Sequence, residues 1–145
     1  MNLRRGEAAD AEAIGTLHRH TIRTSLPFLP DIHTVSEVIA YVGRDLLPNN
    51  EIWVAEDGGR TLGYIAFDAV WINQLYVHPD AQGQGIGPAL LAKALADGRS
   101  RRLWTFQQNT RARKFYEDRG FVLVELTDGS GNEEKAPDVL YEWRP

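Results

Sequence analysis

Residues 72–87, which read INQLYVHPDAQGQGIG, decide how this chain is interpreted. An apolar run ends at Val77, and three glycines then precede a helix that has Pro88 in its first turn. Glycines directly before a helix leave backbone N–H groups unpaired and free of side-chain obstruction. Such groups, together with the positive end of the helix dipole, bind phosphate. Residues 82–87, here called the glycine loop, therefore predict a phosphate site, although a turn that only connects strand to helix has the same composition.

Two widespread phosphate-binding loops do not match this segment. The chain has no Gly-Lys-Ser/Thr, which argues against a nucleoside-triphosphate loop. The dinucleotide fingerprint needs G-x-G-x-x-G in the first strand–helix unit of a repeating α/β chain. Here Gly83-x-Gly85 is followed by Ile86, Gly87 and Pro88, and the loop lies past mid-chain. The third glycine is therefore out of place for a dinucleotide site.

The glycine loop resembles the coenzyme A signature of the GCN5-related N-acetyltransferase (GNAT) superfamily, which is Q/R-x-x-G-x-G/A at the start of a helix. The chain has Gln82-Gly83-Gln84-Gly85-Ile86-Gly87 in that frame, and residues 75–79, LYVHP, resemble the family's fourth strand. Residues 109–121, NTRARKFYEDRGF, resemble the second signature, N-x-x-A-x-x-F-Y-x-x-x-G-F. The order and separation of the two signatures are those of the family, and together they span residues 70–122.

The resemblance implies an α/β (α+β) fold with one domain over residues 1–145. Its mixed central sheet would have about seven strands, splayed between strands 4 and 5, and about four flanking helices. Periodicity and turn residues predict elements in the family's order. The expected strands are 2–5, 51–56, 61–67, a strand ending at 77, 103–106, 121–126 and 139–143. The expected helices are 7–23, 34–45, one from 88 to 97, and 110–119, with a loop at 48–50.

Composition indicates a globular domain and argues against several classes of protein. With 145 residues, 43% hydrophobic and 25% charged, the chain can bury a substantial core. A net charge of -4 provides no electrostatic attraction for nucleic acid or for an anionic membrane. No apolar run reaches membrane-spanning length, and no signal segment follows Met1. The absence of cysteine excludes a cysteinyl acyl-enzyme and a cysteine-ligated metal, so we expect a cytoplasmic enzyme without metal.

If the resemblance holds, acetyl-coenzyme A is the co-substrate and its sites can be named. Pantetheine would pair with the backbone around Leu75 and Val77 like an added strand. The pyrophosphate would bind the glycine loop, formed by Gln82, Gly83, Gln84, Gly85, Ile86 and Gly87. Asn109 would hydrogen-bond the pantetheine or phosphate arm, and its position before a helix also makes it an N-cap residue.

The resemblance assigns Tyr116 as general acid, whereas an aromatic packing role beside Phe115 is the structural alternative. A phenol has an ordinary pKa of about 10, which matches a thiolate leaving group. Many relatives carry a glutamate base near the start of the fourth strand, but Trp71 occupies that place here. Asp68 and His33 are the base candidates, although Asp is favoured in turns and His33 precedes a helix. Removal of the amine's proton through a chain of water molecules, without a single strong base, is a further alternative.

The acceptor is expected to be a small amine or an amino-acid-like molecule, with a protein N-terminus or lysine as the second choice. Aromatic and acidic residues are available for an amine site: Phe28, Trp71, Tyr141, Trp143, Glu133, Glu134 and Asp138. For Glu133 and Glu134 a solvated loop is the favoured interpretation. An acyl-coenzyme A sensor with little turnover is a further alternative. Acetylation of aminoacyl-RNA is disfavoured by the acidic balance, and a homodimer through the last strands is compatible with the sequence.

Overall fold

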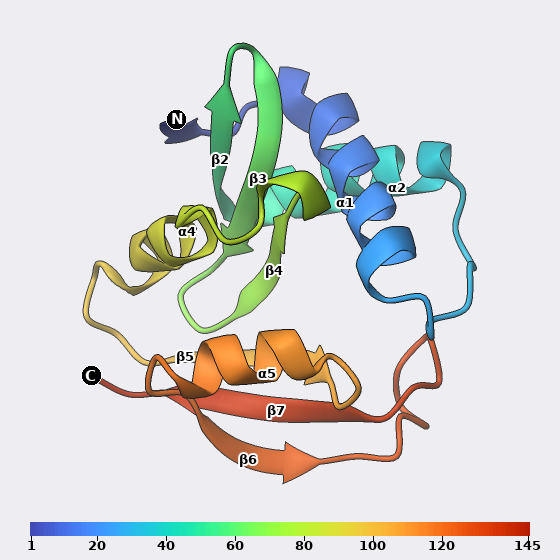
Figure 1. Ribbon diagram of the computed structural model, residues 1–145, viewed down its shortest axis with the longest axis vertical. Coiled ribbons are helices and arrows are strands. Elements are labelled where there is room, and N and C mark those ends of the chain that lie inside the picture. Colours follow the sequence, from blue (N-terminus) through green and yellow to red (C-terminus); the bar gives the residue numbers. More distant parts are fainter.

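The computed structural model describes residues 1–145, and its strands form two antiparallel sheets (Figure 1). The first sheet has the order β1-β2-β3-β4 and the second has the order β5-β7-β6. The strands are β1 (Asn2–Arg5), β2 (Glu51–Asp57), β3 (Arg60–Phe67), β4 (Ile72–Val77), β5 (Arg101–Phe106), β6 (Val122–Leu126) and β7 (Asp138–Trp143). All five residues of the edge strand β6 are exposed, and a dimer through this edge stays a prediction.

Helices cover both faces of the first sheet and one face of the second. In Figure 1, α1 and α2 lie on one side of the first sheet, α4 lies on the other, and α5 lies over the second sheet. The helices are η1 (Ala8–Asp10), α1 (Ala11–Ser25), α2 (Val35–Tyr41), η2 (Val42–Leu46), α3 (Leu47–Asn49), η3 (Pro79–Ala81), α4 (Ile86–Leu95) and α5 (Thr110–Glu117). No helix has both the length and the apolar character needed to cross a membrane.

The side chains of β3 alternate between two apolar clusters, which explains why both faces of this sheet are covered. Tyr64 and Ala66 belong to the cluster formed with α1 and η2, whereas Ile65 and Phe67 belong to the cluster formed with α4. The α4 cluster also contains Leu103 of β5 and residues of β7, so one core joins the two sheets.

The two sheets separate between β4 and β5, as the family resemblance implies. A single parallel bridge, Trp71 to Arg102, links these strands at one end, where the Arg102 N–H donates to the Val70 carbonyl at 2.8 Å. Beyond this bridge β4 pairs only with β3, from Ile72 to Val77. The expected splay is thus confirmed, and it leaves one edge of β4 without a partner strand.

Several predicted boundaries were wrong by a few residues. The helix predicted to stop near Asp45 continues as a π-helical turn and a short α-helix to Asn49, so the predicted loop at 48–50 is mostly helical. Pro48 is tolerated in the first turn of α3, where its missing N–H costs nothing. The predicted capping box is present, because the Thr34 hydroxyl accepts from the Glu37 N–H at 3.2 Å. The helix 110–119 stops at Glu117.

Candidate active site

The glycine loop presents unpaired backbone donors, as its sequence predicts. No backbone N–H from residue 82 to residue 87 donates a hydrogen bond within the protein. Gly83 and Gly85 have φ angles of 81° and 82°, which L side chains rarely adopt. Gly85 is the N-cap of α4 and Ile86 is its first residue, so the free N–H groups lie at the positive end of the helix. The loop can therefore accept an anion such as a pyrophosphate.

The outer edge of β4 offers a second set of backbone groups. The His78 N–H donates to the Leu62 carbonyl at 2.7 Å, which directs its hydrogen bond toward β3. Because antiparallel pairing alternates along a strand, the N–H groups of Val77 and Leu75 point away from β3, toward the separation between the sheets. The Val77 carbonyl on this edge accepts from the Gln82 side chain at 3.3 Å. The edge can therefore pair with an extended polar chain.

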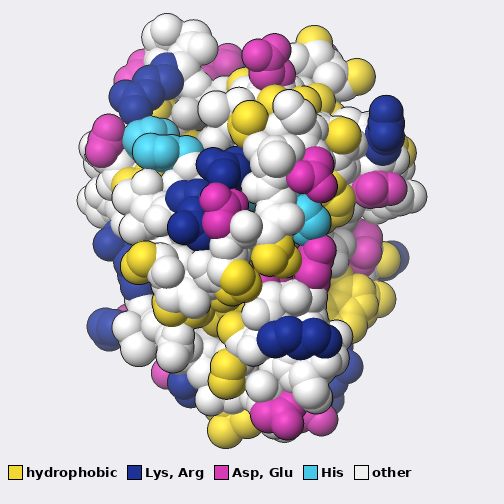
Figure 2. All heavy atoms as spheres, turned by 90° about the vertical axis from the view of Figure 1, so that its right-hand side faces the viewer, with side chains coloured by type: hydrophobic (Ala, Val, Ile, Leu, Met, Phe, Trp, Pro, Cys, Tyr) yellow, Lys and Arg dark blue, Asp and Glu magenta, His cyan; other side chains and the backbone are white.

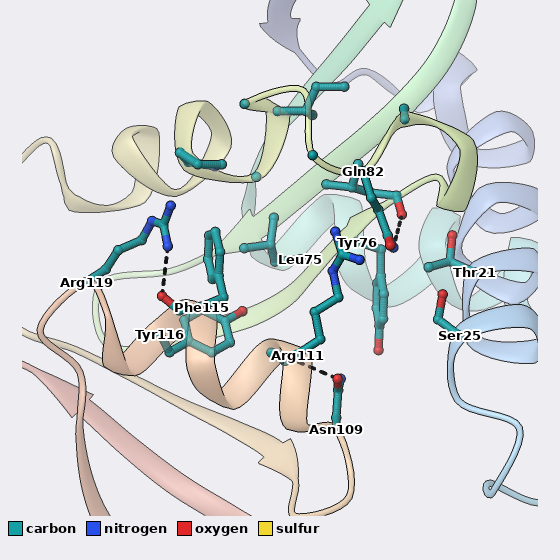
Figure 3. Close-up of a pocket in the computed structure, with 18 of the residues that line it drawn as sticks. Thr21, Ser25, Leu75, Tyr76, Gln82, Asn109, Arg111, Phe115, Tyr116 and Arg119 are labelled. Carbon is teal, nitrogen blue, oxygen red and sulfur yellow. Dashed lines mark hydrogen bonds between the residues drawn. The ribbon is translucent and has the colours of Figure 1, made fainter.

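A first cavity of about 410 Å³ lies between β4, the glycine loop and α5 (Figure 3). Asn109 lines it as the N-cap of α5, with its side-chain oxygen accepting from the Ala112 N–H at 3.2 Å. The cavity brings together nine of the residues named from the sequence: Leu75, Val77, Gln82, Gly83, Gly85, Ile86, Gly87, Asn109 and Tyr116. Gln84 does not line it, although it belongs to the same loop.

Tyr116 lies on the wall of the first cavity with its ring packed between Phe115 and Phe121. The side chain is 7% exposed, and its hydroxyl makes no hydrogen bond within the protein. Burial raises the pKa of the Tyr116 phenol, and the Tyr76 phenol adds to the rise. Tyr116 therefore keeps its proton at neutral pH, but it is a weaker acid than the ordinary phenol that was matched to a thiolate, so it can donate into the cavity only as negative charge develops on the leaving sulfur.

Arg111 on α5 and Arg119 just after it also line the first cavity, and Arg119 was not identified from the sequence. Arg111 has no hydrogen-bond or ion-pair partner in the protein. Arg119 lies 4.1 Å from the centre of the Phe115 ring and donates to the Phe115 carbonyl at 3.0 Å. Lys114 instead pairs with Asp118 at 2.9 Å, away from the cavity. The two arginines add positive charge beside the glycine loop.

A second cavity of about 740 Å³ lies between α1, α2 and the loop before β7. Figure 2 shows this side of the molecule, where basic and acidic side chains lie next to one another around the middle of the face. Tyr76 is the only residue that lines both cavities, so its ring marks the place where they meet. Burial raises the pKa of the Tyr76 phenol, and the carboxylate of Glu134 adds to the rise.

The charges in the second cavity are mostly paired. Arg19 donates two hydrogen bonds to Asp31, at 3.0 and 3.1 Å. His33 lies 2.6 Å from Glu133 and 3.6 Å from Glu37, and the Glu133 contact raises the pKa of the imidazole. His33, one of the two base candidates, therefore lines this cavity, but its contacts favour the cation, which cannot accept a proton. Glu134 has neither a hydrogen bond nor an ion pair within the protein.

Asp68 lies outside both cavities. One oxygen of its carboxylate accepts from the N–H groups of Val70 and Trp71 at 2.9 and 2.7 Å. The other lies 3.3 Å from the Asn73 side chain. These donors hold the pKa of Asp68 below its usual range, against the effect of partial burial. The contacts are those of an aspartate that closes its own turn.

His18 is a cavity residue that the sequence analysis passed over. It is 8% exposed and lines the second cavity, and its Nδ1 lies 2.5 Å from the Tyr64 hydroxyl. The available signal was its position on α1, where Ile14, Leu17 and Thr21 form the buried face with it. A histidine on that face points inward. Glu134 was named from the sequence as an acid available to an amine, although a solvated loop was the favoured interpretation; the fold of the loop places it at the second cavity.

Comparison with known proteins places these features in one family. A family model described as an acetyltransferase (GNAT) domain matches residues 48–123. The peptidyl-lysine N-acetyltransferase YjaB of Salmonella typhimurium is 28% identical over 86% of this chain and 85% of its own length. The L-amino acid N-acyltransferase MnaT of Escherichia coli is 29% identical over 68% of this chain and 63% of its own length. The PaiA N-acetyltransferase of Thermoplasma acidophilum, solved with coenzyme A, has a TM-score of 0.76 at 19% identity over 99% of this chain and 98% of its own.

Proposed function

The chain belongs to the GNAT acetyltransferase family, and from this premise we propose that it transfers the acetyl group of acetyl-coenzyme A to a primary amine. The amine attacks directly in a ternary complex, and the acceptor is a small amine or an amino-acid-like molecule. One observation carries the proposal: two cavities meet at Tyr76, one with free phosphate donors and a buried phenol, the other with an unpaired carboxylate. Two substrates bound in them would face each other.

The residues of the first cavity fit coenzyme A. The free N–H groups of the glycine loop would bind the pyrophosphate, with Arg111 and Arg119 as nearby cations. The outer edge of β4 at Leu75 and Val77 would pair with the amide groups of pantetheine. The amide group of Asn109 faces the same cavity, while its oxygen caps α5. Together these contacts would direct the thioester toward Tyr76 and Tyr116.

Tyr116 would act as the general acid. Its hydroxyl has no partner in the protein, and burial keeps it protonated, so its proton is available to the leaving sulfur. An aromatic packing role does not exclude this one, since the ring packs on Phe115 and Phe121 while the hydroxyl reaches the cavity. The phenolate left behind would recover a proton from the nitrogen that has just been acylated.

Glu134 is the carboxylate that we assign to the acceptor ammonium, in place of Asp68 and His33. It is unpaired, lines the second cavity and interacts with the Tyr76 phenol. It would attract the ammonium and take one proton from it, directly or through water. The amine then forms the C–N bond, the C–S bond breaks, and Tyr116 protonates the sulfur. One proton per turnover leaves to solvent through Glu134.

Lysine side chains are the second candidate acceptors. The similarity to the peptidyl-lysine enzyme YjaB covers most of both chains and favours them. The second cavity favours small zwitterions, because Arg44 and Glu134 offer an unpaired cation and an unpaired anion in one enclosure. We therefore keep the small acceptor as the main proposal.

The proposal is tested by following thiol release from acetyl-coenzyme A with amino acids, simple amines and lysine peptides. Tyr116→Phe serves as the matched variant, because it removes only a hydroxyl that has no partner. We expect acceptor-dependent thiol release that falls in Tyr116→Phe while coenzyme binding is retained. Equal background release by both proteins, with intact coenzyme binding, would instead indicate a sensor that does not turn over.

A further inference from the structure

The Tyr64–His18 pair is a feature that the proposed chemistry leaves unused. His18 belongs to α1 and lies at the wall of the second cavity, with its ring centre 4.7 Å from that of Tyr76. Tyr64 belongs to β3, is fully buried, and makes its one hydrogen bond to His18. His18, held in place by Tyr64 and lying beside the residue where the two cavities meet, has a position from which it can contact the acceptor.

The hydrogen bond determines which nitrogen of His18 carries the proton. The Tyr64 hydroxyl has no other partner, and burial raises the pKa of its phenol, so it keeps its hydrogen and must donate it to Nδ1. The alternative, donation from Nδ1 to Tyr64, would leave a buried O–H without an acceptor. The neutral imidazole therefore carries its hydrogen on Nε2.

The Nε2–H group is free to bind a ligand. It has no partner in the protein, and it is not among the buried polar atoms that lack one, so it reaches the surface of the second cavity. The aromatic rings that face His18 belong to Tyr41, Tyr64 and Tyr76. Burial raises the pKa of the Tyr64 and Tyr76 phenols, so these two stay uncharged at neutral pH. Burial lowers the pKa of His18 to about 4, so the ring acts as a neutral donor throughout the neutral range.

We propose that the His18 Nε2–H binds an oxygen of a carboxylate or carbonyl group attached to the carbon that bears the reacting amine. The acceptor would then be an α-aminoacyl group, either a free amino acid or the first residue of a polypeptide. This inference rests on the proposed function. The ring centres of His18 and Tyr76 lie 4.7 Å apart, so an amino acid whose amine attacks beside Tyr76 would have its own carboxylate within reach of His18. The ε-amine of lysine is separated from the nearest carbonyl by its methylene chain, so that carbonyl would lie farther away.

Charge in the same cavity supports an acceptor of this class. Arg44 lines the cavity with no hydrogen bond or ion pair in the protein, so it can neutralise a carboxylate. Glu134, also unpaired, can bind the ammonium of the same molecule. A free amino acid would satisfy both charges, and an N-terminal residue would satisfy Glu134 and His18 alone.

The test compares four acceptors: an amino acid, its decarboxylated amine, a short peptide with a free N-terminus, and the N-acetylated form of a lysine peptide. Each is assayed with wild type, His18→Leu, Tyr64→Phe and the control His20→Gln. His20 is exposed, lies on the same helix and lines neither cavity. Melting with and without coenzyme A identifies folded variants, and Tyr64→Phe, which removes only a hydroxyl, is the second route if His18→Leu does not fold.

We expect wild type to prefer the amino acid or the free N-terminus to the decarboxylated amine. For the amino acid, His18→Leu should raise KM by about tenfold or more, the effect of losing a hydrogen bond to a charged group; for the peptide, whose carbonyl is neutral, the rise should be about threefold or more. KM for the decarboxylated amine should stay unchanged. His20→Gln should behave as wild type. Acetylation of the blocked lysine peptide alone, or an equal rise of KM for all acceptors, would overturn this inference and leave the acetyltransferase proposal standing. No turnover of any acceptor would overturn both.

Discussion

Replacing Gly85 by alanine should affect two quantities that can be measured separately: the stability of the fold and the affinity for coenzyme A. Gly85 has a φ of 82°, and a Cβ placed there would meet no atom within 4 Å, so the folded protein loses stability only through backbone strain. That strain is about 1–2 kcal/mol for an L residue in the left-handed region. For a domain of this size it lowers Tm by roughly 3–6 °C.

Gly59→Ala is the matched control. Gly59 has a φ of 78°, its Cβ would also meet nothing within 4 Å, and it lies in the β2–β3 turn, outside both cavities. The two variants should therefore lose similar stability in the absence of ligand. A difference between the two variants in the Tm shift caused by coenzyme A would therefore measure the contribution of the glycine loop to binding.

Only Gly85→Ala is expected to weaken coenzyme binding. A methyl group at the start of α4 hinders the approach of a phosphate to the free N–H groups, and one lost charge-assisted hydrogen bond is worth about 1.5–3 kcal/mol. Kd should rise about tenfold or more, and the stabilisation by saturating coenzyme should fall by about 1.4 kcal/mol or more. Thermal shift and calorimetric titration measure both quantities. Equal coenzyme-induced shifts in the two variants would refute phosphate binding by this loop.

Three further predictions concern single side chains. Tyr116→Phe should lower kcat about 100-fold or more, with an unchanged coenzyme-induced shift in Tm; unaltered kcat would exclude the acid role. Glu134→Gln should raise KM for cationic acceptors about tenfold, and more than Glu133→Gln does, which steady-state kinetics would detect. Since the folded pKa of His18 is about 4 and the unfolded value is 6.5, acidification between these values should cost on the order of 3 kcal/mol of stability. His18→Gln should abolish that loss in denaturant titrations at successive pH values.

The sequence predicted nine residues of the first cavity because these nine lie in short segments with recognisable motifs, whereas Thr21, Ser25 and Leu26 of the same cavity come from the distant α1 end and were not predicted. The glycine loop, the edge of β4 and the start of α5 are short segments in which spacing alone determines geometry, and nine named residues line one cavity. The family resemblance supplied the one long-range fact, which is that strands β4 and β5 separate there.

The second cavity could not be predicted to the same extent, because its residues come from distant parts of the chain. The contact between His33 and Glu133 joins residues one hundred positions apart, and the contact between His18 and Tyr64 joins residues 46 positions apart. Spacing carries no signal for such pairs. Glu134 appeared as part of a polar loop, and only the folding of that loop onto α1 and α2 makes it a cavity residue.

The separation of β4 from β5 has a consequence for cohesion. Between strands β4 and β5 themselves, the gap is crossed by one bridge, Trp71 to Arg102, and the two sheets share an apolar core. A bound pantetheine chain would form backbone hydrogen bonds along the free edge of β4, so the substrate would stabilise the sheet as well as react beside it. These hydrogen bonds would be lost and formed again in each turnover, and the edge of β4 would be least protected after coenzyme A has dissociated.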